Sequence, residues 1–111
     1  MTRLPNRRDG VIVVFPWGNF DVHLHYGFNE DREIMEVFGN IFIGGCFREL
    51  DGDLGTIIRD ICRSISLELQ DGTPASVIAY RMIRDDENRA LSLFGAVADA
   101  LVSEPPPSEA N

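Results

Sequence analysis

The first half of the chain alternates between short apolar runs and polar turns, which predicts β-strands. Residues 11–15 are all β-branched or aromatic, and residues 20–26 place apolar and polar side chains at alternate positions, as in a strand with one buried side. Residues 33–38 and 41–43 continue the extended pattern, and the pair Gly39-Asn40 between them predicts a break. Together these segments predict a meander of antiparallel strands with short connections.

The second half changes to the period of a helix. Apolar residues recur at steps of three and four from Leu54 to Leu69, which predicts one continuous helix. Asp53 is its expected N-cap, and Gly72 is the expected left-handed residue just beyond its end. The expected core combines this helix with two strand positions and includes Leu24, Val37, Ile57, Ile61 and Ile65.

Two shorter helices are predicted to follow. The first covers about 74–84, begins at the N-cap Thr73, and buries one side formed by Val77, Ile78 and Met82. The last covers about 87–103, with the acidic residues 85–87 at its start; its apolar stripe consists of Leu91, Phe94, Val97, Ala98 and Leu101. Strands followed by helices predict an α+β fold, in which a small antiparallel sheet from the N-terminal half is covered on one face by the C-terminal helices.

The length of 111 residues suits one domain, which we place at residues 11–103. We expect residues 1–10 to form a flexible arm and the proline-rich residues 104–111 to form a disordered tail. No apolar run is long enough to span a membrane, and the first residues lack the apolar stretch of a secretion signal. The two cysteines have no CxxC spacing, so we expect reduced thiols and a cytoplasmic location.

The composition is acidic, with 18 Asp and Glu residues, 10 Arg residues and a net charge of −8. Binders of nucleic acid or of anionic membranes need a basic surface, so the sequence argues against both partners. The chain has no lysine for a phosphate-binding loop at the glycine pair 44–45, and it lacks the GxGxxG and GxSxG motifs. We therefore predict no catalytic residues and no cofactor.

The clearest polar pattern lies on the alternating strand, where Asp21, His23 and His25 share one side. Histidines at this spacing occur in metal sites, but a site needs at least a third ligand that the sequence does not place, so we predict no bound metal. Trp17 at a hairpin tip is either a core residue or a partner contact. The candidate binding residues are Trp17, Asp21, His23, His25, Gly44, Gly45 and Cys46.

Residues 15–84 carry a series of short motifs in a particular order. They are Pro16-Trp17-Gly18, residues 22–26, Glu30-Asp31, Glu36-Val37-Phe38, Gly44-Gly45, residues 57–69 with Arg63-Ser64-Ile65-Ser66-Leu67 inside them, and Gly72-Thr73-Pro74. This order resembles the TSCPD domain, a small α+β module found near the C-terminus of adenosylcobalamin-dependent (class II) ribonucleotide reductases. The reductase's catalytic barrel and its C-terminal cysteine pair are missing here, and Trp17 stands where the family has a cysteine. The resemblance therefore implies a stand-alone relative of an accessory domain.

Three functions are compatible with these features. The resemblance and the lack of a catalytic set favour a non-catalytic interaction module that binds another protein, such as a ribonucleotide reductase chain without its own C-terminal domain. The alternative is a small metal- or ligand-binding enzyme that uses Asp21, His23 and His25. A third is a nucleotide-sensing regulator, suggested by the family's association and the glycine-rich bend.

The last helix also predicts self-association. Leu93 and Val102 lie away from the centre of its apolar stripe, and a helix that is apolar on more than one side needs more than one partner surface. Pairing about a two-fold axis is the commonest way to bury such a surplus. We therefore expect a homodimer.

Overall fold

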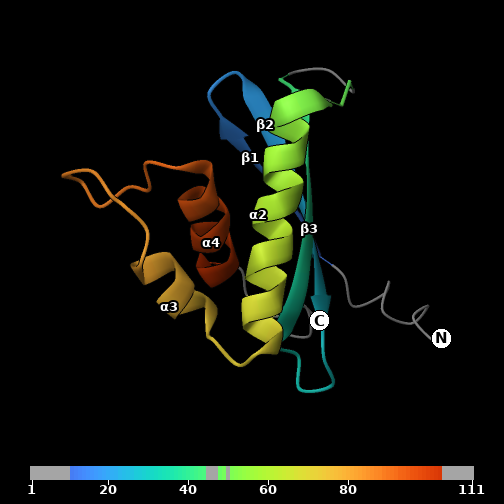
Figure 1. Ribbon diagram of the computed structural model, residues 1–111, viewed down its shortest axis with the longest axis vertical. Helices are drawn as coiled ribbons and strands as arrows, with labels where there is room; N and C mark the ends of the chain where they lie inside the picture. Colours follow the sequence, from blue (N-terminus) through green and yellow to red (C-terminus); the bar gives the residue numbers. More distant parts are fainter. Residues whose placement is uncertain (1–10, 45–47, 50, 104–111) are drawn as a thin grey trace.

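The computed structural model describes residues 11–44, 48–49 and 51–103. These residues form three strands and three helices, β1 (Val11–Trp17), β2 (Phe20–Phe28), β3 (Ile34–Ile43), α2 (Gly52–Gln70), α3 (Ala75–Tyr80) and α4 (Leu93–Ser103). The strands form one antiparallel sheet in the order β1-β2-β3, and the described helices lie on one side of it (Figure 1). The predicted α+β fold is confirmed. The predicted arm and tail lie outside the described residues.

The hairpin between β1 and β2 is closed by two residues, Gly18 and Asn19. Gly18 has a φ of 61°, which the first position of a type II′ turn requires and glycine adopts without strain. Trp17 and Phe20 face each other across the turn, and the pairing continues without a shift to the start of β1. This tight loop therefore fixes the register of the first two strands.

The predicted break at Gly39-Asn40 is wrong, because β3 runs without interruption through both residues. Gly39 marks a close approach of the helix instead. A Cβ atom at this position would lie 2.8 Å from the sulfur of Cys62 and 3.0 Å from Cγ1 of Ile58, both on α2. Glycine thus lets α2 pack tightly against the middle of the strand.

The core lies between the sheet and α2. Four of the five predicted core residues are confirmed, with exposed fractions of 0% for Leu24, 1% for Val37, 8% for Ile61 and 0% for Ile65. The fifth prediction is wrong, since Ile57 is 47% exposed. The apolar side of α2 is broad enough to include both Ile57 and Ile58, and it is Ile58 that faces the core. The apolar residues of α2 that are buried are Ile58, Ile61, Cys62, Ile65 and Leu69.

The two ends of α2 differ from each other. The N-cap is Asp51 rather than Asp53, and its side chain makes no capping hydrogen bond. At the C-terminal end the prediction for Gly72 holds, with a φ of 97°. The N–H of Gly72 donates to the carbonyl of Leu69 and the N–H of Thr73 donates to the carbonyl of Glu68, which together form a Schellman motif.

Helix α3 is shorter than predicted and ends at Tyr80. Its N-cap is Pro74, whose backbone is extended, and not Thr73 as predicted. Ile78 is buried as expected, whereas Val77 is 39% exposed. The helix therefore presents only a narrow apolar face to α4.

Helix α4 begins at Leu93, six residues later than predicted. The acidic residues 85–87 belong to a loop instead, and the hydroxyl of Ser92 accepts the N–H of Gly95 at the true helix start. Leu93 is buried with an exposed fraction of 8%, while Leu91 is 57% exposed. The assignment of Leu91 to the stripe and of Leu93 away from it is therefore wrong, and Leu93 supplies no surplus apolar surface for a dimer.

Within the described residues, none of the helices combines the length and the apolar character that crossing a membrane requires.

Candidate functional site

The side of the sheet opposite the helices carries the most unusual surface. Successive side chains of a strand point to opposite faces, so the register of the three strands defines three rows across this side. The rows are Ile12–His25–Phe38, Val14–His23–Asn40 and Pro16–Asp21–Phe42. We call these nine residues the open sheet face.

Three large apolar side chains of the open sheet face are exposed to solvent. Ile12 is 63% exposed, Val14 53% and Phe38 60%. Scattered apolar residues are common on protein surfaces, but these three occupy two adjacent rows of one face. An apolar surface of this kind is typical of a contact with another molecule.

The centre of the open sheet face is polar. The ring of His23 contacts that of Phe42, with 4.3 Å between the ring centroids. The side-chain amide of Asn40 donates a hydrogen bond to the carboxylate of Glu49. His25 is exposed between Ile12 and Phe38. The face therefore combines aliphatic and aromatic area with imidazole groups that can donate or accept hydrogen bonds.

The structure brings three predicted binding residues together and separates the others from them. Asp21, His23 and His25 lie side by side on the open sheet face, as their alternation predicted. Trp17 lies on the opposite face, where it is partly buried against the core. Gly44 is exposed, and its N–H donates to the carbonyl of Asn19. The two remaining candidates, Gly45 and Cys46, lie outside the described residues.

The arrangement offers no metal centre of the usual kind. Among the residues that the structure describes, no group of three or more His, Cys, Asp or Glu side chains is placed to hold a metal ion. His23 and His25 would need a further ligand from elsewhere. The chemistry that this face supports best is contact with a partner, through its exposed apolar residues.

Those apolar residues were not among the candidates from sequence. Residues 11–15 are apolar at every position, so no alternation distinguishes the side that faces the helices from the side that faces solvent. Phe38 follows Val37 in the same way. Only the register between the strands, together with the position of α2, shows which of these residues remain exposed.

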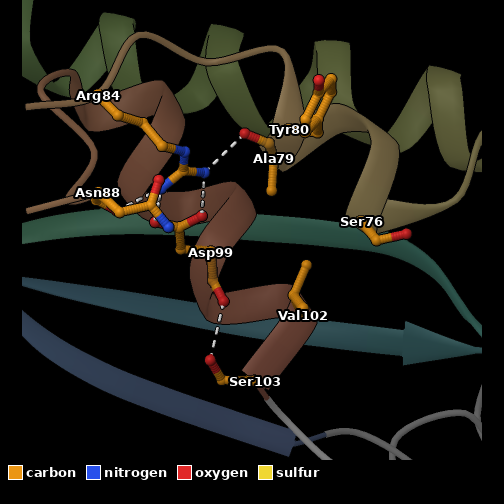
Figure 2. Close-up of a pocket in the computed structure, with 8 residues that line it drawn as sticks. All are labelled: Ser76, Ala79, Tyr80, Arg84, Asn88, Asp99, Val102 and Ser103. Atoms are coloured by element: carbon orange, nitrogen blue, oxygen red, sulfur yellow. Dashed lines mark hydrogen bonds and ion pairs between the residues drawn. The ribbon is translucent and has the colours of Figure 1, made fainter.

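A second candidate is an open cavity of about 610 Å³ between α3 and α4. Figure 2 shows Arg84 at its wall, with its guanidinium group turned toward Asp99. One terminal nitrogen donates to Asp99 Oδ2 (2.9 Å) and to the carbonyl of Asn88, and the other donates to Asp99 Oδ1 (2.7 Å) and to the carbonyl of Ala79. The hydrogen bond to Asp99 raises the pKa of Arg84 above its ordinary value. Because Asp99 neutralises this charge, the group ties α3, the following loop and α4 together and does not serve as an anion site.

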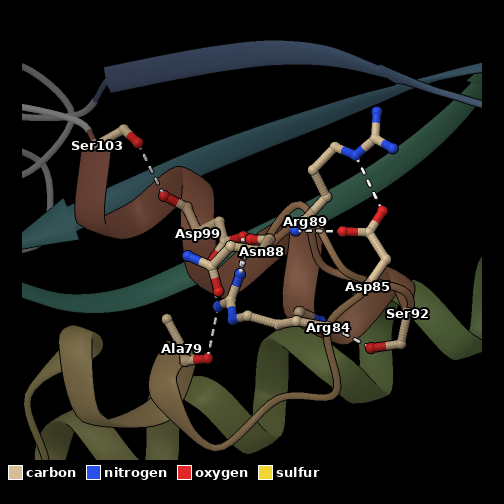
Figure 3. Close-up of polar contacts among 9 residues, drawn as sticks. Ala79, Arg84, Asp85, Asn88, Arg89, Ser92, Asp99 and Ser103 are labelled. Carbon is tan, nitrogen blue, oxygen red and sulfur yellow. Dashed lines mark hydrogen bonds and ion pairs between the residues drawn. The ribbon is translucent and has the colours of Figure 1, made fainter.

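The loop beside this cavity is organised by Asp85, as Figure 3 shows. Its Oδ1 atom accepts the N–H groups of Glu87 and Arg89, and its Oδ2 atom accepts Nε of Arg89. The N–H of Arg89, followed by the other bonds, holds the pKa of Asp85 below its ordinary value. The acidic residues 85–87 therefore form a turn that the side chain of Asp85 stabilises, as expected for a carboxylate that accepts hydrogen bonds from nearby backbone.

Cys62 is not a reactive thiol. It is 2% exposed and lies in the core beneath Gly39. Burial raises its pKa from 9.0 to about 12, so the neutral thiol persists at physiological pH and lacks the nucleophilic thiolate form.

The two edges of the sheet are treated differently. At β3, the hydroxyl of Ser66 accepts the N–H of Val37 (2.9 Å) and donates to its carbonyl (3.2 Å), while the side-chain amide of Gln70 donates to the carbonyl of Met35 (3.1 Å). The N–H of Ile43 donates to the carbonyl of Arg48. At β1, no described residue bonds to the backbone on the outer side.

Comparisons with family models, with curated proteins and with solved structures found no match to this chain. The resemblance to the TSCPD domain therefore rests on the order of motifs in residues 15–84 alone.

Proposed function

We propose that this protein is a non-catalytic interaction module whose open sheet face binds another protein chain. The observation that carries the proposal is the exposure of Ile12, Val14 and Phe38, at 63%, 53% and 60%, on one face of the sheet. Contiguous exposed apolar residues beside polar ones are typical of protein interfaces. A helix or sheet that covered this face would bury the three side chains and leave the histidines as polar contacts at the centre.

The proposed partner is a class II ribonucleotide reductase chain that lacks its own small C-terminal domain. The support is the resemblance of residues 15–84 to that domain, since a chain that carries such a module can supply it to a reductase only by binding that reductase. The chain has a net charge of −8, and like charges at an interface oppose association. We therefore expect the partner surface to be neutral or basic.

The alternative, an enzyme built on Asp21, His23 and His25, has less support. The three side chains share a face, but the described residues supply no further metal ligand beside them. We expect elemental analysis of the purified chain to find no stoichiometric zinc or iron. One metal ion per chain that disappears in a His23→Ala variant would instead favour the enzyme.

The proposal is tested by titrating the purified chain into a class II ribonucleotide reductase chain without its C-terminal domain, with calorimetry as the readout. We expect saturable binding, weakened at least about tenfold by Phe38→Glu, because the carboxylate would be buried without a partner. Leu91→Glu is the matched control, since Leu91 is 57% exposed but lies beside α4. No binding, or equal weakening by both substitutions, would contradict the proposal.

A further inference from the structure

Strand β1 has the composition of a strand from the middle of a sheet but lies at the edge. Its sequence, VIVVFPW, contains no charged residue. Val13, Phe15 and Trp17 pack against the core on one side, and Ile12 and Val14 project from the other. Strands that are apolar on both faces are typically covered on both faces and paired on both edges.

The register shows which backbone groups of β1 face outward. Trp17 and Phe20 close a two-residue hairpin, so they form a hydrogen-bonded pair, and such pairs alternate along an antiparallel ladder. Ile12, Val14 and Pro16 therefore direct their backbone away from β2. Proline has no N–H, and this is the position at which a strand tolerates it. No described residue pairs with this edge, which presents two N–H groups and three carbonyls.

Within the described residues this edge has little protection against pairing. Natural edge strands carry charges, prolines, bulges or covering segments that prevent association with another strand, and of these β1 has only Pro16, at its end next to the hairpin. At β3 the side chains of Ser66 and Gln70 serve this purpose. No described residue does so at β1, whose seven residues include neither a charge nor a register shift.

We propose that two copies of this chain associate through β1, antiparallel about a two-fold axis at Val13, so that the two three-stranded sheets become one sheet. In this register Ile12 lies opposite the partner subunit's Val14, and all outward N–H and carbonyl groups of these two residues are paired. Pro16 lies beyond the central pairs, where its missing N–H costs nothing. The association uses the outward backbone groups of β1, whereas the proposed function uses the side chains of the open sheet face; Ile12 and Val14 belong to both surfaces, and Phe38 belongs only to the open sheet face.

A second copy can occupy this edge because β1 itself carries no charge. Each copy has a net charge of −8, so two copies repel each other wherever acidic side chains approach. Strand β1 is an uncharged stretch of seven residues, along which two copies can meet without opposed carboxylates in the strands. The pairing is also self-complementary, since β-branched side chains face β-branched side chains on both sides of the joined sheet.

Amide hydrogen exchange measured by NMR at increasing concentrations of the full chain tests the proposal. We expect the Val13 and Phe15 amides to be protected at all concentrations, because they bond to β2. The Ile12 and Val14 amides should exchange freely in dilute samples and become protected as the concentration rises from roughly 10 µM to 1 mM. Protection of both at every concentration would mean that the chain covers its own edge, and exchange at every concentration would mean an open edge. Either result overturns the proposal.

Two matched substitutions locate the interface by light scattering. Val14→Lys should weaken self-association at least tenfold, although it lowers the net negative charge and would otherwise favour association. Phe38→Lys makes the same charge change at a position of the open sheet face on β3, away from the β1 edge, and we expect it to leave the dimer intact. If Phe38→Lys removes the dimer and Val14→Lys does not, the copies meet face to face and the proposal fails. Val102→Glu should remove the dimer only if α4 forms the contact, and that result would also overturn the proposal. If Val14→Lys folds poorly, Ile12→Lys repeats the test of the β1 edge.

Discussion

Along β3 the outward backbone groups of Met35, Val37 and Ile43 are bonded by α2 and by Arg48, whereas along β1 no described residue reaches the corresponding groups. Both strands belong to the same small sheet and both are rich in β-branched and aromatic residues. The difference arises because α2 runs beside β3, as Figure 1 shows, and its Ser66 and Gln70 side chains bond the backbone of Val37 and Met35. A neighbouring helix can thus protect an edge in addition to the charges, prolines and bulges of the strand itself.

The two edge strands also show that apolar residues of a strand can be either buried or exposed, depending on which face of the sheet they occupy. In β3 the alternate residues Val37 and Ile41 are buried at 1% and 0%, and the face that they form is covered by α2. In β1 the outward-facing Ile12 and Val14 remain more than half exposed. Apolar residues on the side of each strand that faces the helices therefore record a contact within the chain, whereas Ile12 and Val14 of β1 and Phe38 of β3 form surface that no described residue covers.

The largest expected effect concerns the helix that protects β3. Ile61→Ala should lower the free energy of unfolding by about 2–5 kcal/mol, because it leaves a cavity under α2. Ile57→Ala, at a position that is 47% exposed, should change it by less than about 0.5 kcal/mol. Urea unfolding of both variants checks this. Equal costs would mean that α2 presents a different side to the sheet.

Removing the hydroxyl at the β3 edge should have the next largest effect. Ser66→Ala leaves the partly buried N–H and carbonyl of Val37 without their partner, which should cost about 1–3 kcal/mol. Amide exchange at Val37 should accelerate in parallel. Ser64→Ala changes an exposed serine of the same helix and serves as the control. If the two variants are equally stable, the β3 edge does not depend on this contact.

The buried thiol of Cys62 provides a pH test of the packing between α2 and β3, because it lies beneath Gly39 of β3. Burial raises the pKa of Cys62 to about 12, so above the ordinary thiol value the unfolded chain loses a proton that the folded chain keeps. Stability must then fall as the pH rises, by about 1.4 kcal/mol between pH 7 and pH 10. We expect the difference in unfolding free energy between the native chain and Cys62→Ala to shrink by this amount. A constant difference would place Cys62 in contact with solvent.

The smallest effect is expected at the β1 edge. Ile12→Thr keeps a β-branched side chain at a position that is 63% exposed, so the unfolding free energy of the dilute monomer should change by less than about 0.5 kcal/mol. A loss above about 1 kcal/mol would show that other residues of the chain cover Ile12, and the contrast between the two edges would disappear.

Period-two alternation was sufficient to place Asp21, His23 and His25 on one side of a strand, because each residue of β2 is clearly apolar or polar. The same logic fails in β1, where every residue from 11 to 15 is apolar. It also fails for the phase of α2, because an arc that includes both Ile57 and Ile58 can face the sheet in more than one orientation. In both cases the choice is made by tertiary packing.

Local chemistry explains the remaining errors. The acidic residues 85–87 suit a helix start as well as a turn, and the two hydrogen bonds that Asp85 accepts from nearby backbone select the turn. Gly39 suits a strand end as well as a close helix approach, and only the position of Cys62 and Ile58 distinguishes them. The association with a ribonucleotide reductase remains a proposal from motif order.

The hydroxyl contact between Ser66 and Val37 also has a consequence for the order of events during folding. The two residues are 29 positions apart, and Met35 and Gln70 are 35 apart, whereas the β1–β2 hairpin is closed by two residues. Contacts between neighbouring segments form in microseconds, and contacts that close long loops form later. We expect the sheet to assemble before α2 docks, so that for a short interval a newly synthesised chain exposes both edges. In that interval crowding by other nascent copies favours misassembly, because both strand edges are open to them.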